Sequence, residues 1–332
     1  MLSFPTNQPS KQTIENPIAQ FGGALSDGNF FFPALKNEQN DHRLCYVERF
    51  PRPGESVRGK KFELGNGGKG ANQAVASAKL GATVKMIGMV GDDMFGEHNL
   101  ENLRKAGVNT ELVVKQKYSP TGCAAITVDE NGENNIVINP GANAYLTPER
   151  ARELESEIAK AEMIICQAEV PEDANLEALR LARKHGVKTV FNPAPGYDMN
   201  RKILEFTDII CTNETETECI VQSKLNSVDE FKDAAKKMLD YGPRMAIITL
   251  GEKGVLVAER SNGDVKVDHV ESEKGAGDCF CGSLVHLLVN CPELKTLEAV
   301  RKASQIAALS VQKCGCQSSY PTIEEAKKKG IL

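Results

Sequence analysis

Short apolar runs recur along the chain, and each is followed by a stretch with the periodicity of a helix. The runs are VKMIGMV (84–90), EMIIC (162–166), VKTVF (187–191), DIIC (208–211) and MAIITL (245–250). In one of the helical stretches, Phe231, Ala235 and Leu239 recur at four-residue steps. Alternation of buried strands with amphipathic helices is typical of a parallel sheet that helices cover on both faces. The sequence therefore predicts an α/β fold with a doubly wound, mostly parallel sheet.

Two more polar segments do not follow this alternation. TGCAAITVDENGENNIVINPGAN alternates apolar and polar residues around Asn131-Gly132, which is a strong signal for a hairpin turn. LCYVERFPRPGESVRGKKFELG also has the pattern of extended chain, with Pro and Gly as turn residues. We expect these segments, at about 42–64 and 121–140, to form a small antiparallel β-sheet that stands off the main domain as a lid. A pair of surface loops is the alternative.

The N-terminal segment has a different composition from the rest of the chain. Pro, Gly, Ser and Asn occur throughout residues 1–40, and the apolar residues there have no period. We expect this segment to be irregular or disordered. A chain of 332 residues has room for one large domain or two ordinary ones. Because the same strand–helix unit repeats, we expect one domain over residues 41–332.

Composition limits the partners and the location of the protein. Lysine and arginine number 40 and aspartate and glutamate 45, so the net charge of −5 gives no reason to expect a nucleic-acid or membrane partner. No apolar run reaches the roughly 18 residues of a membrane span, and the N-terminus lacks the apolar stretch of a signal peptide. The ten cysteines are scattered, several of them in apolar runs, which indicates buried free thiols rather than disulfides or zinc ligands. We therefore expect a cytoplasmic protein, with the nucleus as a second location.

Polar residues or glycines follow each of the five apolar runs. The segments are Gly91-Asp92-Asp93, Gln167-Ala168-Glu169, Asn192-Pro193-Ala194-Pro195, Thr212-Asn213-Glu214-Thr215-Glu216 and Thr249-Leu250-Gly251. In open α/β sheets, ligands bind beyond the carboxyl ends of the strands. Any one of these segments could be no more than a helix cap, but five on one edge favour a polar binding site.

A glycine-rich segment, GNGGKG (65–70), formally matches a dinucleotide-binding fingerprint, with Asp92 at a suitable spacing. That fingerprint requires a buried apolar strand directly before it. The preceding VRGKKFEL is instead charged at alternate positions, which argues against a nicotinamide-dependent enzyme. The chain also contains no GxxxxGK[ST] segment, which excludes a Walker-type nucleotide site.

The segment GAGD (275–278) lies at the predicted start of a helix. The apolar residues that follow fall on one helical face: Phe280, Leu284, Leu287 and Leu288. Free backbone N–H groups at a helix start favour a bound anion, and small residues let a phosphate approach them. Asp278 could be a plain N-terminal charge, or it could be a base that takes a proton from an alcohol while the amides hold phosphoryl charge.

Several segments together resemble the ribokinase-type carbohydrate kinases. NGGKGANQAVASAKLGATVKMIGMVGDDMFG (66–96) and GAGDCFCGSL (275–284) are similar to the two signatures of this family, and QAEVP, NPAP, TNETE, TLGEKG and AALSVQKCGCQSSYP lie between and after them in the family's order. The resemblance covers about residue 41 to the end of the chain. It implies the family's fold and in-line transfer of the γ-phosphoryl group of ATP to the primary hydroxyl of D-ribose, which gives ribose 5-phosphate.

The resemblance also implies a role for residues in each motif. In catalysis, Asp278 would be the base and the backbone of Gly275, Ala276 and Gly277 the anion hole. The sugar pocket would contain Asp41, Gly68, Lys69, Gly70, Ala71, Asn72, Glu169 and Asp278. The ATP site would contain Asn213, Thr249, Leu250, Gly251, Glu252, Lys253, Gly254, Gly277 and Ser304.

Metal ions and a second subunit are implied in the same way. Mg²⁺ would be held through water by Glu216. A monovalent cation, potassium, would be held by Ser310, Lys313, Gly315 and Ser319. The substrates would be ATP and D-ribose, and two copies of the chain would form a homodimer through the lid.

The sequence departs from the family pattern in two places. The family opens with a buried strand that ends in G-S-x-N-x-D, whereas PALKNEQN precedes Asp41 here, so we expect that strand to be missing. The family's D-T-T before GAGD is replaced by Ser272, Glu273 and Lys274, which argues against potassium activation. Lys274 is a candidate to replace the charge of the cation. These departures leave two alternatives open: a kinase of this fold for another sugar or a nucleoside, and a non-catalytic sugar- or nucleotide-binding homologue.

Overall fold

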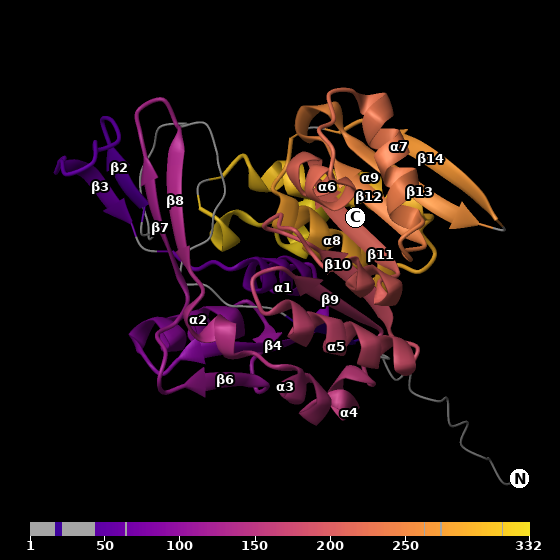
Figure 1. Cartoon of the computed structure of the whole chain (residues 1–332), viewed down its shortest axis with the longest axis horizontal. Coiled ribbons are helices and arrows are strands. Elements are labelled where there is room, and N and C mark those ends of the chain that lie inside the picture. Colours follow the sequence, from indigo (N-terminus) through magenta and orange to yellow (C-terminus); the bar gives the residue numbers. More distant parts are fainter. Residues whose placement is uncertain (1–16, 22–43, 64, 262, 273, 314) are drawn as a thin grey trace, which may run out of the picture.

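The fold is built on a large sheet of ten strands, with a second, small sheet beside it (Figure 1). A computed structural model describes residues 17–21, 44–63, 65–261, 263–272, 274–313 and 315–332. Nine strands of the large sheet lie side by side in the order β14 (Asp264–Val270), β13 (Val255–Ser261), β12 (Met245–Thr249), β11 (Ile209–Asn213), β10 (Lys188–Asn192), β9 (Met163–Gln167), β1 (Pro17–Phe21), β4 (Thr83–Gly91) and β5 (Val108–Asn109). The tenth strand, β6 (Val113–Gln116), pairs with β4.

The pairing confirms the predicted doubly wound fold. From β12 to β5 and β6 every pairing is parallel, and only β13 and β14 are antiparallel additions at one edge. Each of the five apolar runs of the sequence forms one of these strands. Long apolar runs form central strands here because both faces of the sheet are covered.

Helices cover both faces of the sheet and make two hydrophobic cores. One core lies under α1 (Lys69–Lys79), α2 (Met94–Lys105), α8 (Gly277–Asn290) and α9 (Thr296–Ser310). The other lies under α3 (Pro148–Glu153), α4 (Glu155–Ile158), α5 (Glu172–Lys184), α6 (Glu214–Val221) and α7 (Val228–Leu239). Successive strand residues enter opposite cores: Met245 and Ile247 face one, and Ala246 and Ile248 face the other. The chain closes with α10 (Ile323–Lys328).

The predicted absence of the first strand is wrong. Pro17–Phe21 forms β1, which pairs in parallel with β4 on one side and β9 on the other, in the middle of the sheet. The prediction of an irregular segment over residues 1–40 is therefore wrong for these five residues. So short a segment cannot show an apolar period, whereas its backbone N–H and C=O groups are what the two neighbouring strands need. The rest of the segment and Asp41 lie outside the described residues.

The small sheet has the order β3 (Gly59–Glu63), β2 (Leu44–Val47), β7 (Cys123–Val128) and β8 (Asn134–Asn139). The hairpin turn at Asn131-Gly132 is confirmed, because β7 and β8 pair across it and Gly132 has a φ of 82°. The sheet is mixed rather than antiparallel throughout, since β2 pairs with β7 in parallel. Each hairpin fixes its own antiparallel pairing locally, but the two hairpins are far apart in the sequence, and nothing local fixes the direction in which they meet.

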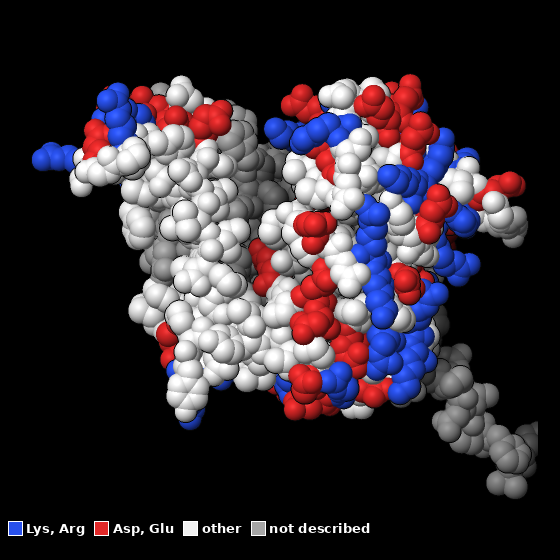
Figure 2. Space-filling model, viewed as in Figure 1, with Lys and Arg blue, Asp and Glu red and all other residues white. Residues whose placement is uncertain are grey.

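The base of the β7–β8 ribbon is tied to the large sheet at Thr121. The Thr121 hydroxyl donates to Asp93 Oδ1 (2.6 Å) and accepts from the Gly91 backbone N–H (2.9 Å), directly after β4. Gly91 must be a glycine here, because a Cβ would lie 2.3 Å from the Thr121 nitrogen. In the view of Figure 2, charged side chains are concentrated on the right-hand half of the α/β domain, whereas the visible side of the ribbon is mostly uncharged. A notch opens between these two parts of the molecule.

None of the described helices is long and apolar enough to span a membrane.

Candidate active site

Helix α8 starts without a side-chain cap. Its N-cap residue is Ala276, and no side-chain hydrogen bond to the first backbone N–H groups is present. Gly275 lies against α9, where a Cβ would come within 2.7 Å of the Ala307 Cβ. At Gly277 the opposite holds, since a Cβ there would meet no atom within 4 Å. The helix start is thus fixed from behind and open in front, an arrangement in which the backbone N–H groups can receive an anion.

The Asp278 carboxylate is buried beside this helix start, with only 2% of the residue exposed. Two side chains of α1 hold it. Asn72 Nδ2 donates to Oδ2 and Gln73 Nε2 donates to Oδ1, each at 2.9 Å. Each carboxylate oxygen therefore has its own amide donor, and the two hydrogen bonds together fix the plane of the carboxylate.

A lysine and two further carboxylates lie close enough to Asp278 to interact electrostatically. Burial lowers the pKa of Lys69, but the charges of Asp278, Glu169 and Glu216 outweigh burial and raise the pKa above its ordinary value. Burial is the main reason that the pKa of Glu169 is raised to about 7; the charge of Lys69 opposes this shift and the charge of Asp278 adds to it. The backbone N–H of Lys69 donates to Glu169 Oε2 (2.6 Å). The end of β9 and the start of α1 thus meet at one charged site.

The Glu216 carboxylate belongs to a capping box at the start of α6. Asn213 Oδ1 accepts from the Glu216 backbone N–H (2.8 Å), and Glu216 Oε2 accepts from the Asn213 backbone N–H (2.9 Å). Burial raises the pKa of Glu216. Glu216 Oε1 also accepts from Asn213 Nδ2 (2.9 Å), so both carboxylate oxygens already have a donor. Such a carboxylate fits a magnesium ion that keeps its waters, because Mg²⁺ dehydrates reluctantly. Among the residues that the structure describes, no three His, Cys, Asp or Glu side chains form a metal-binding group.

The predicted ATP segment follows β12 and borders α6. Thr249 Oγ1 donates to the Thr212 carbonyl (3.2 Å), and Lys253 Nζ lies 3.3 Å from Glu214 Oε1. Gly254 has a φ of 91°, and a Cβ there would lie 2.3 Å from the Val270 carbonyl oxygen. Leu250 is buried, whereas Gly251, Glu252 and Lys253 form an exposed turn. Ser304 is buried in α9 and donates to the Val300 carbonyl.

The residues predicted for a monovalent cation make contacts with other parts of the chain. Ser310 and Ser319 donate to the carbonyls of Ala307 and Cys316, both at 2.7 Å. Lys313 makes an ion pair with Glu325. Gly315 has a φ of 93° and supplies no side chain. With a serine, Ser272, in place of the family's aspartate, these residues include no carboxylate ligand, and we assign no potassium to them.

Most of the other predicted residues do come together. Asn72 contacts Asp278, the Lys69 backbone contacts Glu169, and the Lys69 side chain interacts with Asp278, Glu169 and Glu216. Gly68 is the N-cap of α1, and Gly70 and Ala71 are buried in its first turn. Lys274, proposed as a substitute for the cation, is exposed. Its neighbour Glu273 lies outside the described residues.

The sequence prediction missed the amides behind these residues. Gln73 contacts Asp278 directly, and Gln317 Nε2 donates to Asn72 Oδ1 (2.9 Å). Both residues lie inside motifs that carry the resemblance, GGKGANQA and GCQSSYP, so their place was available in the sequence. Nothing in the residue types alone distinguishes an amide that touches a base from one that caps a helix.

The chain is similar in sequence to known carbohydrate kinases. The model of the pfkB family carbohydrate kinases matches residues 38–323. A ribokinase from Mus musculus is 39% identical over 284 residues, which cover 84% of this chain and 88% of that protein. A deoxyribokinase from Salmonella typhi is 36% identical over 287 residues, which cover 85% of this chain and 93% of that protein.

Solved structures show the same fold. A ribokinase from Arabidopsis thaliana, in complex with ribose and ATP, superposes with a TM-score of 0.82 at 26% identity, over 95% of this chain and 98% of that one. The family match spans both signature segments, including the open helix start and the carboxylate beside it. The chain belongs to the pfkB family of carbohydrate kinases.

Proposed function

We propose that the protein phosphorylates D-ribose at its primary hydroxyl with ATP, which gives D-ribose 5-phosphate and ADP. The observation that carries this proposal is the Asp278 carboxylate, buried next to the uncapped start of α8 and held by Asn72 and Gln73. A carboxylate beside an anion site suits a reaction in which a neutral hydroxyl loses its proton to that carboxylate while negative charge builds up on a phosphoryl group. The mouse ribokinase at 39% identity supports ribose as the acceptor.

In this mechanism Asp278 accepts the proton of the sugar hydroxyl. The hydroxyl oxygen attacks the γ-phosphorus, and the bond from that phosphorus to the bridging oxygen breaks, so that ADP leaves. The backbone N–H groups of Gly275, Ala276 and Gly277 are placed to stabilise the charge on the transferred group. Lys69, whose raised pKa keeps it protonated, adds a positive charge nearby. Glu216 would hold a hydrated Mg²⁺, which would supply positive charge against the phosphates of ATP.

The remaining site residues fit recognition of the two substrates. Three neighbouring side chains can bind hydroxyl groups of a sugar: the ammonium group of Lys69, the amide of Asn72 and the carboxyl group of Glu169. With a pKa of about 7, Glu169 can donate as well as accept a hydrogen bond. Asn213 and the turn from Thr249 to Gly254 provide the border for ATP.

We assign the small sheet two roles. It would close over the sugar as a lid, which excludes water and limits ATP hydrolysis. Its exposed apolar side chains, Phe62 (65% exposed) and Val137 (68% exposed), would pack against the same face of a second copy in a homodimer. The nine cysteines of the described residues are free thiols, which suits the reducing cytoplasm as the location.

Two alternatives remain as competitors. The Salmonella deoxyribokinase makes 2-deoxy-D-ribose the most relevant other sugar, and a nucleoside is the acceptor that differs most in size. A non-catalytic homologue has less support than the sequence suggested, because β1 is in place in the middle of the sheet.

The test is a coupled assay of ADP formation with ATP and Mg²⁺, with and without potassium. It compares three acceptors, D-ribose, 2-deoxy-D-ribose and inosine, with a control that contains no acceptor. We expect the highest kcat/KM for D-ribose and no loss of rate when potassium is omitted. A higher kcat/KM for 2-deoxy-D-ribose or inosine would change the substrate assignment. Ribose binding in calorimetry without any turnover would favour the non-catalytic alternative.

A further inference from the structure

A chain of buried amide side chains runs from the large sheet to Asp278. Asn192 Nδ2, at the end of β10, donates to the Cys211 carbonyl of β11 (2.9 Å). Asn192 Oδ1 accepts from Gln73 Nε2 (2.9 Å), which also donates to Asp278 Oδ1 (2.9 Å). Gln167 Nε2, at the end of β9, donates to Gln73 Oε1 (2.8 Å). Three neighbouring strands therefore hold one side chain of α1.

The direction of this chain is fixed at its far end. The Cys211 backbone oxygen can only accept, so Asn192 must turn its NH₂ group toward it and its Oδ1 toward Gln73. Gln73 must then present its NH₂ group to Asn192, and the second N–H of that group points at Asp278. A flipped Gln73 would place its oxygen against two other oxygens and its NH₂ group against the NH₂ group of Gln167.

Burial makes the direction costly to reverse. Gln73 and Gln167 are 0% exposed and Asn192 is 6% exposed, so water cannot replace a lost partner freely. An unsatisfied buried amide costs about 1–3 kcal/mol. Both side-chain N–H groups and the side-chain oxygen of Gln73 have hydrogen-bond partners, so only one orientation of this side chain satisfies all three bonds.

We infer that Gln73 is a positioning residue for the phosphoryl transfer, which orients the Asp278 carboxylate through a hydrogen-bond chain whose direction is set by the Cys211 carbonyl. The inference rests on the proposed function, because it gives Asp278 the role of base. Gln73 does not need to touch either substrate for this role. Without its N–H, Oδ1 loses its donor and the carboxylate can turn about the bond that joins it to Cβ.

The test compares two variants in the full-length protein. Gln73→Met keeps the length and volume of the side chain but removes the donor. Thr189→Val is the matched control, because Thr189 is a buried residue of β10 that donates to the Phe206 carbonyl (2.8 Å), away from Asp278. We expect Gln73→Met to lower kcat about 10²-fold, since a small misplacement of a catalytic group has an effect of this size. The KM values for the sugar and ATP should change less than about threefold, because a transition-state interaction is lost rather than ground-state binding.

Asn192→Leu should lower kcat in the same way but less, by about tenfold, because Gln73 keeps its contact with Asp278 but loses the partner that fixes its direction. Thr189→Val should leave kcat unchanged. The inference is overturned if folded Gln73→Met retains its kcat, if only its KM rises, or if Thr189→Val lowers kcat as much.

A second measurement does not depend on activity. In the ¹H–¹⁵N spectrum, the Gln73 side-chain amide signals are identified by their loss in Gln73→Met. We expect their protons to exchange slowly with solvent and to shift in Asp278→Asn. If the wild-type protein phosphorylates none of the acceptors, the proposed function fails, and these signals still decide the inference: fast exchange, or no shift in Asp278→Asn, would refute it.

Discussion

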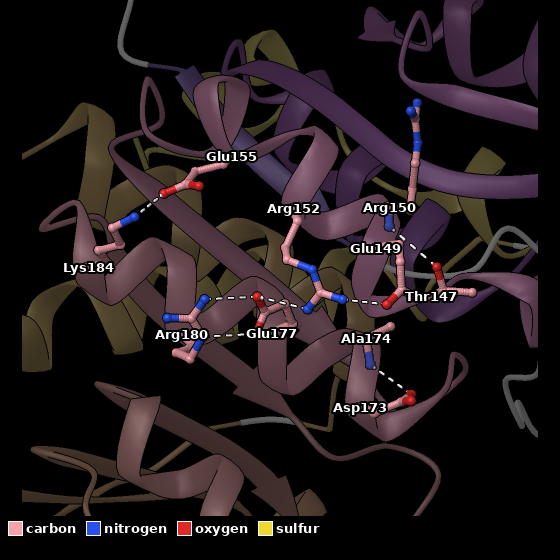
Figure 3. Close-up of polar contacts among 10 residues, drawn as sticks. All are labelled: Thr147, Glu149, Arg150, Arg152, Glu155, Asp173, Ala174, Glu177, Arg180 and Lys184. Atoms are coloured by element: carbon pink, nitrogen blue, oxygen red, sulfur yellow. Dashed lines mark hydrogen bonds and ion pairs between the residues drawn. The ribbon is translucent and has the colours of Figure 1, made fainter.

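Two polar networks of this molecule differ in their burial and in the type of interaction that holds them together. Around Asp278, buried amides make single, directed hydrogen bonds to one carboxylate. On the far side of the sheet, α3, α4 and α5 carry an exposed network of ion pairs (Figure 3). There, Arg180 makes two bonds of 2.8 Å to Glu177, Arg152 joins Glu177 to Glu149, and Lys184 contacts Glu155.

The difference shows what each network can do. The exposed ion pairs lower the pKa of Glu155 to about 2, through its bonds to Lys184 and His185. Water and salt reach most of these side chains and can replace their partners, so the geometry is not enforced and each pair contributes little to stability. In the buried network no replacement is available, so a single group can be held in one orientation for chemistry. We therefore expect the proposed phosphoryl transfer to depend on the buried network rather than on the exposed ion pairs.

The largest effect is expected from Asp278→Asn. The amide keeps the shape of the side chain but cannot accept the proton, so kcat should fall about 10³-fold, within the usual range for loss of a general base. Ribose and ATP should still bind, as measured by calorimetry. Asp240→Asn is the matched control, because Asp240 is an exposed partner of Arg260 in a surface ion pair and should retain full kcat. A kcat above a tenth of the wild-type value in Asp278→Asn would show that the buried network has no part in catalysis.

Glu169→Gln should have the next largest effect. Replacing a carboxyl partner of the sugar by an amide should raise the KM for D-ribose about tenfold, the equivalent of one hydrogen bond. The KM for ATP should not change. Glu214→Gln, an exposed glutamate that pairs with Lys253 at the ATP border, should instead leave the ribose KM unchanged. Equal shifts in both variants would contradict the assignment of Glu169 to the sugar.

The same variant tests the effect of burial on stability. The pKa of Glu169 is about 7 in the folded protein against 4.5 ordinarily. Between these values the folded protein binds a proton that the unfolded chain has lost, so this group makes stability fall as pH rises from 4.5 to 7. Glu169→Gln should remove that loss, on the order of 1–3 kcal/mol, when urea denaturation is compared at pH 5 and pH 8. An unchanged pH dependence would show that Lys69 compensates the buried charge fully.

The next prediction concerns the packing of α8 against α1, next to the buried network. In α8, a Cβ at Gly282 would lie 2.5 Å from the Gln73 backbone oxygen and 2.7 Å from the Ala76 Cβ. Gly282→Ala should therefore push α8 from α1 and destabilise the fold by about 1–3 kcal/mol, as overpacking does. The sign is diagnostic in urea denaturation, because Gly→Ala at an unobstructed helix position stabilises by about 1 kcal/mol. Stabilisation would mean that α1 and α8 are not in close contact.

The sequence predicted most of the fold and the charged residues of the candidate site. The reasons are different for the strands and for the site residues. The apolar runs predict strands because burial on both faces requires continuous apolar residues. Asp278, Lys69 and Glu169 are predicted because they lie in motifs or at strand ends. Pro17–Phe21 was missed because five residues carry no period, although two neighbours pair with them. Gln73 was missed because its partners, Asn192 and Asp278, are 119 and 205 residues away.

The smallest effect is expected in the exposed ion-pair network, from Arg152→Ala. Arg152 joins Glu149 of α3 to Glu177 of α5, so its loss removes the link between two helices (Figure 3). Arg180 still binds Glu177 with two bonds, and water takes the place of the guanidinium. The Tm should fall by less than about 3 °C, less still at high salt, and kcat and KM should not change. A larger fall that persists at high salt would show that this network enforces geometry as the buried one does, and the distinction drawn between the two would fail.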